Sequence, residues 1–192
     1  MNPQEVVLIT PDDRAIGVME KMEAHRKGVL HRAFSIFIFD RRGRMLLQQR
    51  APQKYHGAYL WTNACCSHPM WNEPVEEAAQ RRLMEELGFQ TTLKKIFVFT
   101  YKATVENNLI EHEYDHVFAG EYEGPINMNR EEVCNYEYHD LQTLKKQLGE
   151  EPERFTSWFK IAFPQIEAWW KAHYSEGSQV LNAIREQENN QP

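Results

Sequence analysis

The sequence predicts one α/β domain in which a mixed β-sheet is covered by helices, and three patterns carry this prediction. The chain has 192 residues, 42% of them hydrophobic, which is enough to bury a full core without disulfides or metals. Apolar runs typical of strands come in pairs separated by turn residues. Helical patterns follow the strands without a regular strand–helix–strand alternation, which favours a mixed sheet over a purely parallel one.

Two hairpins are expected from the paired strand patterns. Residues 33–40 and 45–50 flank the turn "RRGR", and residues 94–104 and 110–122 flank the polar "VENNL". A strand is also expected near residues 134–140. If the second hairpin folds about Asn107, Tyr101 and Glu113 lie opposite each other.

Three helices are expected, over residues 73–89, 140–148 and 156–174. In the first, Asn72 is placed to cap, Pro74 fits the first turn and Gly88 fits the C′ position. Its apolar positions recur at spacings of three and four. We therefore expect one domain over residues 1–174, followed by a polar tail over residues 175–192 that is a frayed helix or disordered.

The composition excludes several classes of protein. A net charge of −6 argues against a generic nucleic-acid binder. No apolar run reaches the roughly 18 residues of a membrane span, and the N-terminus has no signal-peptide pattern, so a soluble cytoplasmic protein without a membrane partner is expected. The three cysteines are expected to be free thiols. The sequence leaves a monomer and a homodimer equally open.

Residues 67–89 carry charged residues at fixed spacing. They resemble the signature of the Nudix family, G-x5-E-x7-R-E-U-x-E-E-x-G-U, in which U is aliphatic. The matching positions are Glu73, Arg81, Leu83, Glu85, Glu86 and Gly88, with Phe89 at the final apolar position. Ser67 replaces the first glycine, and Arg82 replaces the glutamate after Arg81. The resemblance implies a Nudix-like α/β/α sandwich with a mixed β-sheet.

Arg82 changes what this site is expected to do. In Nudix pyrophosphohydrolases the carboxylates of the signature helix hold Mg²⁺ on a diphosphate, because hard cations prefer oxygen ligands. An arginine at one of these positions removes a metal ligand and adds a phosphate-binding cation. The pattern therefore favours a site that holds a diphosphate over one that hydrolyses it.

Four further motifs accompany the signature: "TNACCSHP" at 62–69, "AHRKGVLH" at 24–31, "EHE" at 111–113 and "FTSWFK" at 155–160. Together, over residues 5–170, they resemble the type I isopentenyl-diphosphate isomerases. That family interconverts isopentenyl and dimethylallyl diphosphate. The resemblance implies an isomerase of isoprenoid biosynthesis whose partner is a small allylic diphosphate.

The motifs also supply a candidate metal site, formed by His25, His31, His68, Glu111 and Glu113. Because strand side chains alternate between faces, Glu111 and Glu113 lie on one face, about 7 Å apart along the backbone, and His112 points away. Imidazole and carboxylate donors suit a divalent ion such as Zn²⁺, Mn²⁺ or Mg²⁺.

The resemblance assigns the acid/base chemistry to Cys66 and Glu113. Moving a double bond by one carbon needs one proton added and another removed from C2, which requires two groups on opposite sides of the substrate. Glu113 with Tyr101 is implied on the alkene side and Cys66 on the other face, while Cys65 is expected to pack in the core. The reaction passes through a tertiary carbocation, which the indole face of Trp158 is implied to stabilise in a dry pocket.

The diphosphate needs local cations in a chain that is acidic overall. Family positions that contact the diphosphate are matched by Lys21, Arg50, Lys54 and Arg82, with Ser67 near enough to donate a hydrogen bond. A second ion, Mg²⁺, is expected to bridge the phosphate oxygens and Glu86, with the carbonyl of Cys66 as a further ligand. Arg81–Glu85 and Arg82–Glu86 are also i,i+4 pairs, so simple helix salt bridges are the alternative, which we favour for Arg81.

Two other functions fit parts of the pattern. The first is a Nudix pyrophosphohydrolase acting on a nucleoside diphosphate derivative, and Arg82 is the residue that discriminates against it. The second is a metal-stabilised binding domain without catalytic activity.

Overall fold

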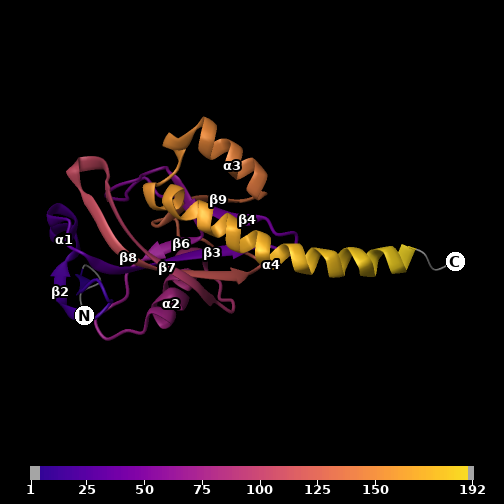
Figure 1. Cartoon of the computed structure of the whole chain (residues 1–192). Coiled ribbons are helices and arrows are strands. Elements are labelled where there is room, and N and C mark those ends of the chain that lie inside the picture. Colours follow the sequence, from indigo (N-terminus) through magenta and orange to yellow (C-terminus); the bar gives the residue numbers. More distant parts are fainter. Residues whose placement is uncertain (1–4, 190–192) are drawn as a thin grey trace.

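The computed structural model describes residues 5–189, with side chains through Tyr174. In this part of the chain a mixed nine-stranded sheet has helices on both faces (Figure 1). The strands are β1 (Glu5–Ile9), β2 (Ala15–Glu20), β3 (His31–Phe39), β4 (Met45–Arg50), β5 (Trp61–Asn63), β6 (Cys65–Ser67), β7 (Lys94–Thr104), β8 (Ile110–Glu121) and β9 (Val133–His139). The predicted α/β/α sandwich is confirmed.

Strand β3 is the centre of the sheet. It pairs parallel with β8 over its whole length and antiparallel with β1, β4 and β6. Its apolar run "AFSIFIF" has no polar face, as expected of a strand that is buried on both sides. Phe37 and Phe39 pack on one face of the sheet, and Ile36 and Ile38 pack on the other.

Each face of the sheet has its own hydrophobic cluster. Helix α2 (Val75–Leu87) buries Ala78, Ala79, Leu83 and Leu87 against the face that carries Ile36. Helices α3 (Leu141–Glu150) and α4 (Ser157–Asn189) cover the other face, where Phe159 and Ile166 pack against Phe37 and Phe39. Figure 1 shows α2 on the opposite side of the sheet from α3 and α4.

Both predicted hairpins are present, and Tyr101 pairs with Glu113 across the second one. The predicted Asn72 cap of α2 is wrong. The helix starts after Pro74 without a side-chain cap, and Asn72 has a φ of 62°, as a left-handed turn residue. The turn is held by Glu73, whose carboxylate accepts from the Met70 backbone N–H at 2.7 Å.

Some elements were not predicted from the sequence, and the last helix is longer than predicted. Helix α1 (Lys21–Lys27) and the 3₁₀ turns η1 (Glu106–Asn108) and η2 (Pro152–Arg154) were not anticipated. Helix α4 continues past the predicted end at Tyr174 to Asn189, so residues 175–189 are helical and residues 190–192 lie outside the described part. Within residues 5–189, no helix has both the length and the apolar character that a membrane crossing requires.

Gly88 provides a test of this packing. Its φ is +72°, and a Cβ there would lie 2.5 Å from the backbone oxygen of Asn127. We expect Gly88→Ala to lower the free energy of unfolding by about 2 kcal/mol or more, because it combines left-handed strain with a clash against backbone. Gly149→Ala in α3 meets nothing within 4 Å and should be neutral or slightly stabilising. Urea denaturation measures both, and equal effects would contradict the expectation.

Candidate active site

A pocket lies where strands β6, β7 and β8 meet the loop 51–60 and the start of α4. Its lining brings together residues that are far apart in the sequence, and most of them were predicted as site residues. They are Lys21, Phe34, Arg50, Lys54, Tyr55, His56, Cys66, Ser67, His68, Arg82, Tyr101, Glu111, Glu113 and Trp158. His25 and His31 are fully buried beside this lining.

Four donors are close enough to share one metal ion: His25, His31, His68 and Glu113 have ligand atoms within 4.8 Å of one another. The Nδ1 atoms of His25 and His31 lie 2.6 Å from the Lys21 carbonyl and 2.8 Å from the Val29 carbonyl. Because a carbonyl only accepts, each Nδ1 carries the proton and each Nε2 keeps its lone pair. Both Nε2 atoms are buried, and no partner for them occurs among the described side chains.

The ionisation of these imidazoles fits metal binding. Burial lowers the pKa of His25 to about 4 and that of His68 to about 3, so both rings are neutral at pH 7. A neutral imidazole is the form that binds a metal. The buried unpaired nitrogens and the adjacent carboxylate therefore fit a divalent cation.

Glu111, Glu113 and Tyr101 form a hydrogen-bonded triad on the hairpin of β7 and β8. The Tyr101 hydroxyl lies 2.7 Å from Glu113 Oε2 and 3.0 Å from Glu111 Oε2. A phenol has one proton, so it can bond both oxygens only if one carboxyl is protonated. Burial and the neighbouring Glu113 raise the pKa of Glu111 to about 8. Burial also acts to raise the pKa of Glu113, but the adjacent imidazoles of His31 and His68 outweigh it and hold the pKa of Glu113 well below the usual value.

The thiol of Cys66 faces the same pocket. Trp158 Nε1–H donates to the sulfur at 2.9 Å, and the thiol donates to Asn63 Oδ1 at 2.9 Å. Burial, followed by the nearby Asp115, raises the pKa of the Cys66 thiol. The neutral thiol is therefore the resting form. Cys65 is fully buried in the cluster under α2, which confirms it as a packing residue.

Trp158 is held in place from several directions. Besides its bond to Cys66, its ring has the Arg50 guanidinium 5.1 Å from the centroid and the His56 ring edge-on at 5.7 Å. One indole face is therefore already next to a permanent cation. A cationic intermediate would have to use the face that Arg50 does not cover.

Four cations gather at one end of the pocket: Lys21, Arg50, Lys54 and Arg82. Burial lowers the pKa of Lys21 to about 8, and repulsion from Lys54, Arg50 and Arg82 adds to the shift. The Lys21 ammonium also lies 4.4 Å from the centroid of the Tyr55 ring. A polyanion bound here would relieve the repulsion, so this end is suited to phosphate groups.

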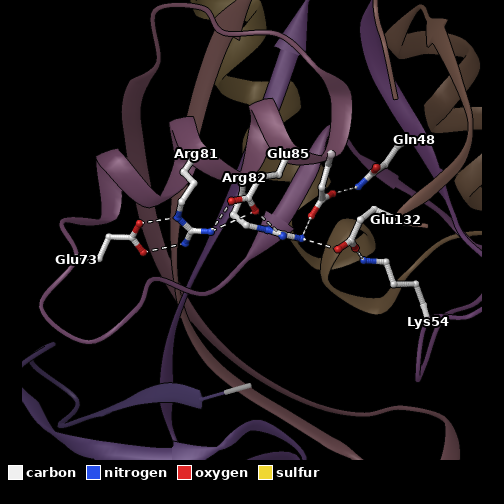
Figure 2. Close-up of polar contacts among 8 residues, drawn as sticks. Gln48, Lys54, Glu73, Arg81, Arg82, Glu85 and Glu132 are labelled. Carbon is white, nitrogen blue, oxygen red and sulfur yellow. Dashed lines mark hydrogen bonds and ion pairs between the residues drawn. The ribbon is translucent and has the colours of Figure 1, made fainter. Parts of the chain in front are cut away.

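Helix α2 carries an extended ionic chain (Figure 2). Arg81 pairs with Glu73 at 2.7 Å and with Glu85 at 3.2 Å, which agrees with the helix salt bridge favoured from the sequence. Arg82 bonds Glu86 Oε1 at 2.5 Å and lies 3.3 Å from Glu132.

The carboxylates at the pocket end of this chain are already engaged. Glu86 also accepts from the Gln48 amide at 3.0 Å, and it does not line the pocket. Glu132 joins Arg82 to Lys54, so one carboxylate holds two of the pocket cations side by side. Arg82 and Gln48 together engage both oxygens of Glu86.

Comparison of the sequence with known proteins shows the family to which the chain belongs. Residues 29–159 match the NUDIX domain model. The isopentenyl-diphosphate Delta-isomerase of Pectobacterium atrosepticum is 46% identical over 174 residues, which cover 91% of this chain and 97% of that protein. The enzyme of the same name from Serratia proteamaculans is 51% identical over 154 residues, 80% of this chain and 86% of that protein.

The chain belongs to the isopentenyl-diphosphate Delta-isomerase family. This isomerase family shares its fold with more distant solved structures. DR0079 from Deinococcus radiodurans has a TM-score of 0.65 at 15% identity, covering 77% of this chain and 90% of that one. A MutT protein from Methanosarcina mazei Go1 has a TM-score of 0.59 at 19% identity, covering 72% of this chain and 94% of that one. At these identities the likeness concerns the fold alone.

Several residues in the isomerase-family pocket were missed from the sequence. His56 and Tyr55 lie in the irregular loop 51–60, where no periodic pattern marks them. Ser35 bonds Asp115 at 2.7 Å and lies 3.5 Å from the Cys66 sulfur, but it sits in an apolar strand. Among these neighbours of Cys66, only Asn63 could have been predicted from the sequence, because it lies at a fixed spacing from Cys66 in the motif.

Removal of one imidazole tests the metal site. We expect His31→Ala to weaken Zn²⁺ binding about 100-fold or more, because His31 presents a buried, unpartnered Nε2 to Glu113. Competition against a chromophoric chelator measures the dissociation constant. His173→Ala, on the exposed side of α4, is the matched control and should leave the constant unchanged. Equal affinity in both variants would show that the ion binds elsewhere.

Proposed function

We propose that this chain interconverts isopentenyl and dimethylallyl diphosphate in isoprenoid biosynthesis by adding and removing protons on a C5 allylic system. The observation that carries the proposal is one pocket that holds a thiol, a hydrogen-bonded Glu113–Tyr101 pair and a group of cations. The relatives that carry the isomerase name match over most of the chain.

The cations are proposed to bind the diphosphate. Lys21, Arg50, Lys54 and Arg82 would contact its oxygens, with Ser67 as a hydrogen-bond donor. A Mg²⁺ ion carried with the diphosphate is proposed at Glu86 and the carbonyl of Cys66. Binding there requires Arg82 to exchange its bond to Glu86 for one to phosphate, which the free energy of a charge-assisted phosphate contact can offset.

The proton transfers are proposed for Glu113 and Cys66. In one direction Glu113, bonded to Tyr101, supplies a proton to the terminal alkene carbon, and the Cys66 sulfur takes a proton from C2. In the reverse direction the Cys66 thiol returns a proton to C2, and Glu113 takes one from the methyl carbon. Each direction leaves one group with a proton gained and the other with a proton lost, so the charges balance. The resting thiol and the ionised Glu113 carboxylate are the forms that the reverse direction uses, and the forward direction starts from the protonated carboxyl and the thiolate.

The tertiary carbocation formed on protonation needs a site that excludes water. Trp158, Tyr101 and Phe34 provide apolar surface, and Trp158 is 5% exposed. The Trp158 face away from Arg50 is proposed to stabilise the cation through its quadrupole.

The His/Glu cluster is proposed to hold a divalent ion, Zn²⁺, Mn²⁺ or Mg²⁺, through His25, His31, His68 and Glu113, whose donors lie within 4.8 Å of one another. Glu111, which lies in a second donor group with His25, is proposed as the fifth ligand. When bound, the ion would supply a fixed positive charge beside the Glu113 carboxylate. In the free protein His68 contacts Oε1 of Glu113 at 3.0 Å and Tyr101 donates to Oε2 at 2.7 Å, so both carboxylate oxygens are positioned.

We further propose a cytoplasmic enzyme that acts as a monomer or a homodimer. Residues 1–174 are proposed as the isomerase domain. The helical segment 175–189 is proposed to be a C-terminal extension outside this domain.

The proposal is tested by incubating the purified protein with Mg²⁺ and isopentenyl diphosphate in D₂O. The expected result is acid-labile dimethylallyl diphosphate with deuterium incorporated. No deuterium and no product would contradict the proposal. Phosphate release from a panel of nucleotides would instead support a pyrophosphohydrolase.

The two neighbouring cysteines give a matched pair of variants. Cys66→Ala should lower kcat by about 100- to 10,000-fold, because it removes one of the two acid/base groups. Cys65→Ala should keep kcat within about threefold and lower stability only slightly, since Cys65 packs in the core. Steady-state kinetics measure kcat for both variants. Similar losses of kcat in the two variants would contradict the assignment of Cys66 as an acid/base group.

A further inference from the structure

Glu132 holds two of the pocket cations although it does not itself line the pocket. It lies directly before β9, and its side chain is 26% exposed. Glu132 Oε2 pairs with the Lys54 ammonium, and Oε1 lies 3.3 Å from Arg82 Nη2 (Figure 2). A carboxylate at this place repels anions, and the proposed function gives it no role. Its position between two phosphate-binding side chains points to an effect that offsets the repulsion.

The backbone of the Glu132 loop is tied to both elements that supply these cations. The Ala51 N–H donates to the Glu132 carbonyl at 3.1 Å, which joins the loop to the segment that carries Lys54. The Asn129 N–H donates at 2.9 Å to a carbonyl of helix α2, which carries Arg82. The Glu132 N–H in turn donates to the Asn129 carbonyl at 3.0 Å. The carboxylate is therefore a fixed point between two elements that are distant in the sequence.

The other carboxylates around Arg82 do not relate it to Lys54. Arg82 Nη1 donates to Glu85 at 2.8 Å and Nη2 donates to Glu86 at 2.5 Å, but both acceptors lie on the same helix as Arg82. Arg82 Nε is buried without a partner in the described part of the chain, so the guanidinium keeps a donor for a ligand. When Arg82 exchanges Glu86 for a phosphate, as proposed, Glu132 still holds the guanidinium beside Lys54.

The two cations form a pair whose spacing is set before any ligand binds. Lys54 and Arg82 contact different oxygens of Glu132, so they flank its carboxylate from two sides. A diphosphate has oxygens on two phosphorus atoms and can accept from both cations at once. Donors that are already in place lose less entropy when such a ligand binds. The fixed pair therefore favours a ligand with two phosphoryl groups.

We propose that Glu132 is a positioning residue that makes the cation end of the pocket selective for a diphosphate over a monophosphate. It holds Lys54 and Arg82 as a preorganised pair that two adjacent phosphoryl groups bridge. The negative charge of Glu132 lowers the affinity for every anion, and the fixed geometry restores it only for a ligand that meets both cations. This inference rests on the diphosphate site of the proposed function and not on its proton transfers.

Calorimetric titration of the full chain with inorganic diphosphate and with inorganic phosphate, both with Mg²⁺ present, tests the selectivity. The parent should bind diphosphate at least about 10-fold more tightly than phosphate, since one further charge-assisted hydrogen bond contributes that much. Glu132→Gln should weaken diphosphate binding about 10-fold and keep phosphate binding within about threefold of the parent. Retained phosphate binding also shows that the variant is folded.

Glu131→Gln is the matched control, because it removes the same charge one residue away. The Glu131 side chain is exposed, and its backbone carbonyl accepts from the Gln53 amide at 2.8 Å. This variant should bind both anions as the parent does. Glu132→Gln would overturn the proposal if it weakened both anions equally, tightened both or changed neither. A parent that binds neither anion would overturn the proposed diphosphate site as well.

Steady-state kinetics give an independent readout of the same variant. Glu132→Gln should raise the KM for isopentenyl diphosphate about 10-fold and keep kcat within about threefold, because it removes binding that the ground state and the transition state share. A loss of kcat at unchanged KM would contradict a positioning role on the diphosphate. A parent without turnover would count against the isomerase reaction and leave the titrations to decide the role of Glu132.

Discussion

The parallel pairing of β3 with β8 is the constraint on which the site depends. Its register sets His31 beside Glu113, so an imidazole and a carboxylate meet at the pocket. The same strand pairs with β6 on the register Ser35–Cys66, which places the thiol on the pocket a few residues further along β3. A one-residue slip would turn these side chains to the opposite face. The apolar residues of β3 are buried on both faces of the sheet. A slip would move each of them into the hydrophobic cluster on the opposite face, where it does not fit, so the packing opposes it.

The pocket concentrates buried charge at a cost to stability. Glu86, Glu111 and Glu113 are all less than 9% exposed, and Lys21 lies among three other cations. Each carboxylate is offset by partners: Arg82 and Gln48 for Glu86, Tyr101 for the other two. The histidine nitrogens and the cations have fewer partners in the free protein. These are the groups that a divalent ion and a diphosphate would satisfy, so the unfavourable electrostatics mark the binding sites.

The sequence predicted regular elements better than irregular ones. Both hairpins, and with them the Tyr101–Glu113 pair, follow from alternating apolar residues and turn residues, which depend on local geometry. The cluster of His25, His31, His68 and Glu113 was predicted only through its motifs, because composition does not show that α1, β3, β6 and β8 converge. His56 was missed, since its position is set by backbone contacts from Arg50 and Glu106 that are distant in the chain. The Asn72 cap failed because tertiary contacts of Glu73 with Arg81 and Met70 determine the entry into α2.

The central claim is that Cys66 and Glu113 act from opposite faces of a substrate held between them. The stereochemistry of the reaction tests this most directly. Isopentenyl diphosphate labelled stereospecifically with deuterium at C4 and at C2 would be converted in tritiated water, and the chirality of the new methyl group determined. The account predicts that the proton enters C4 on one face and leaves C2 from the opposite face. Entry and departure on the same face would contradict it.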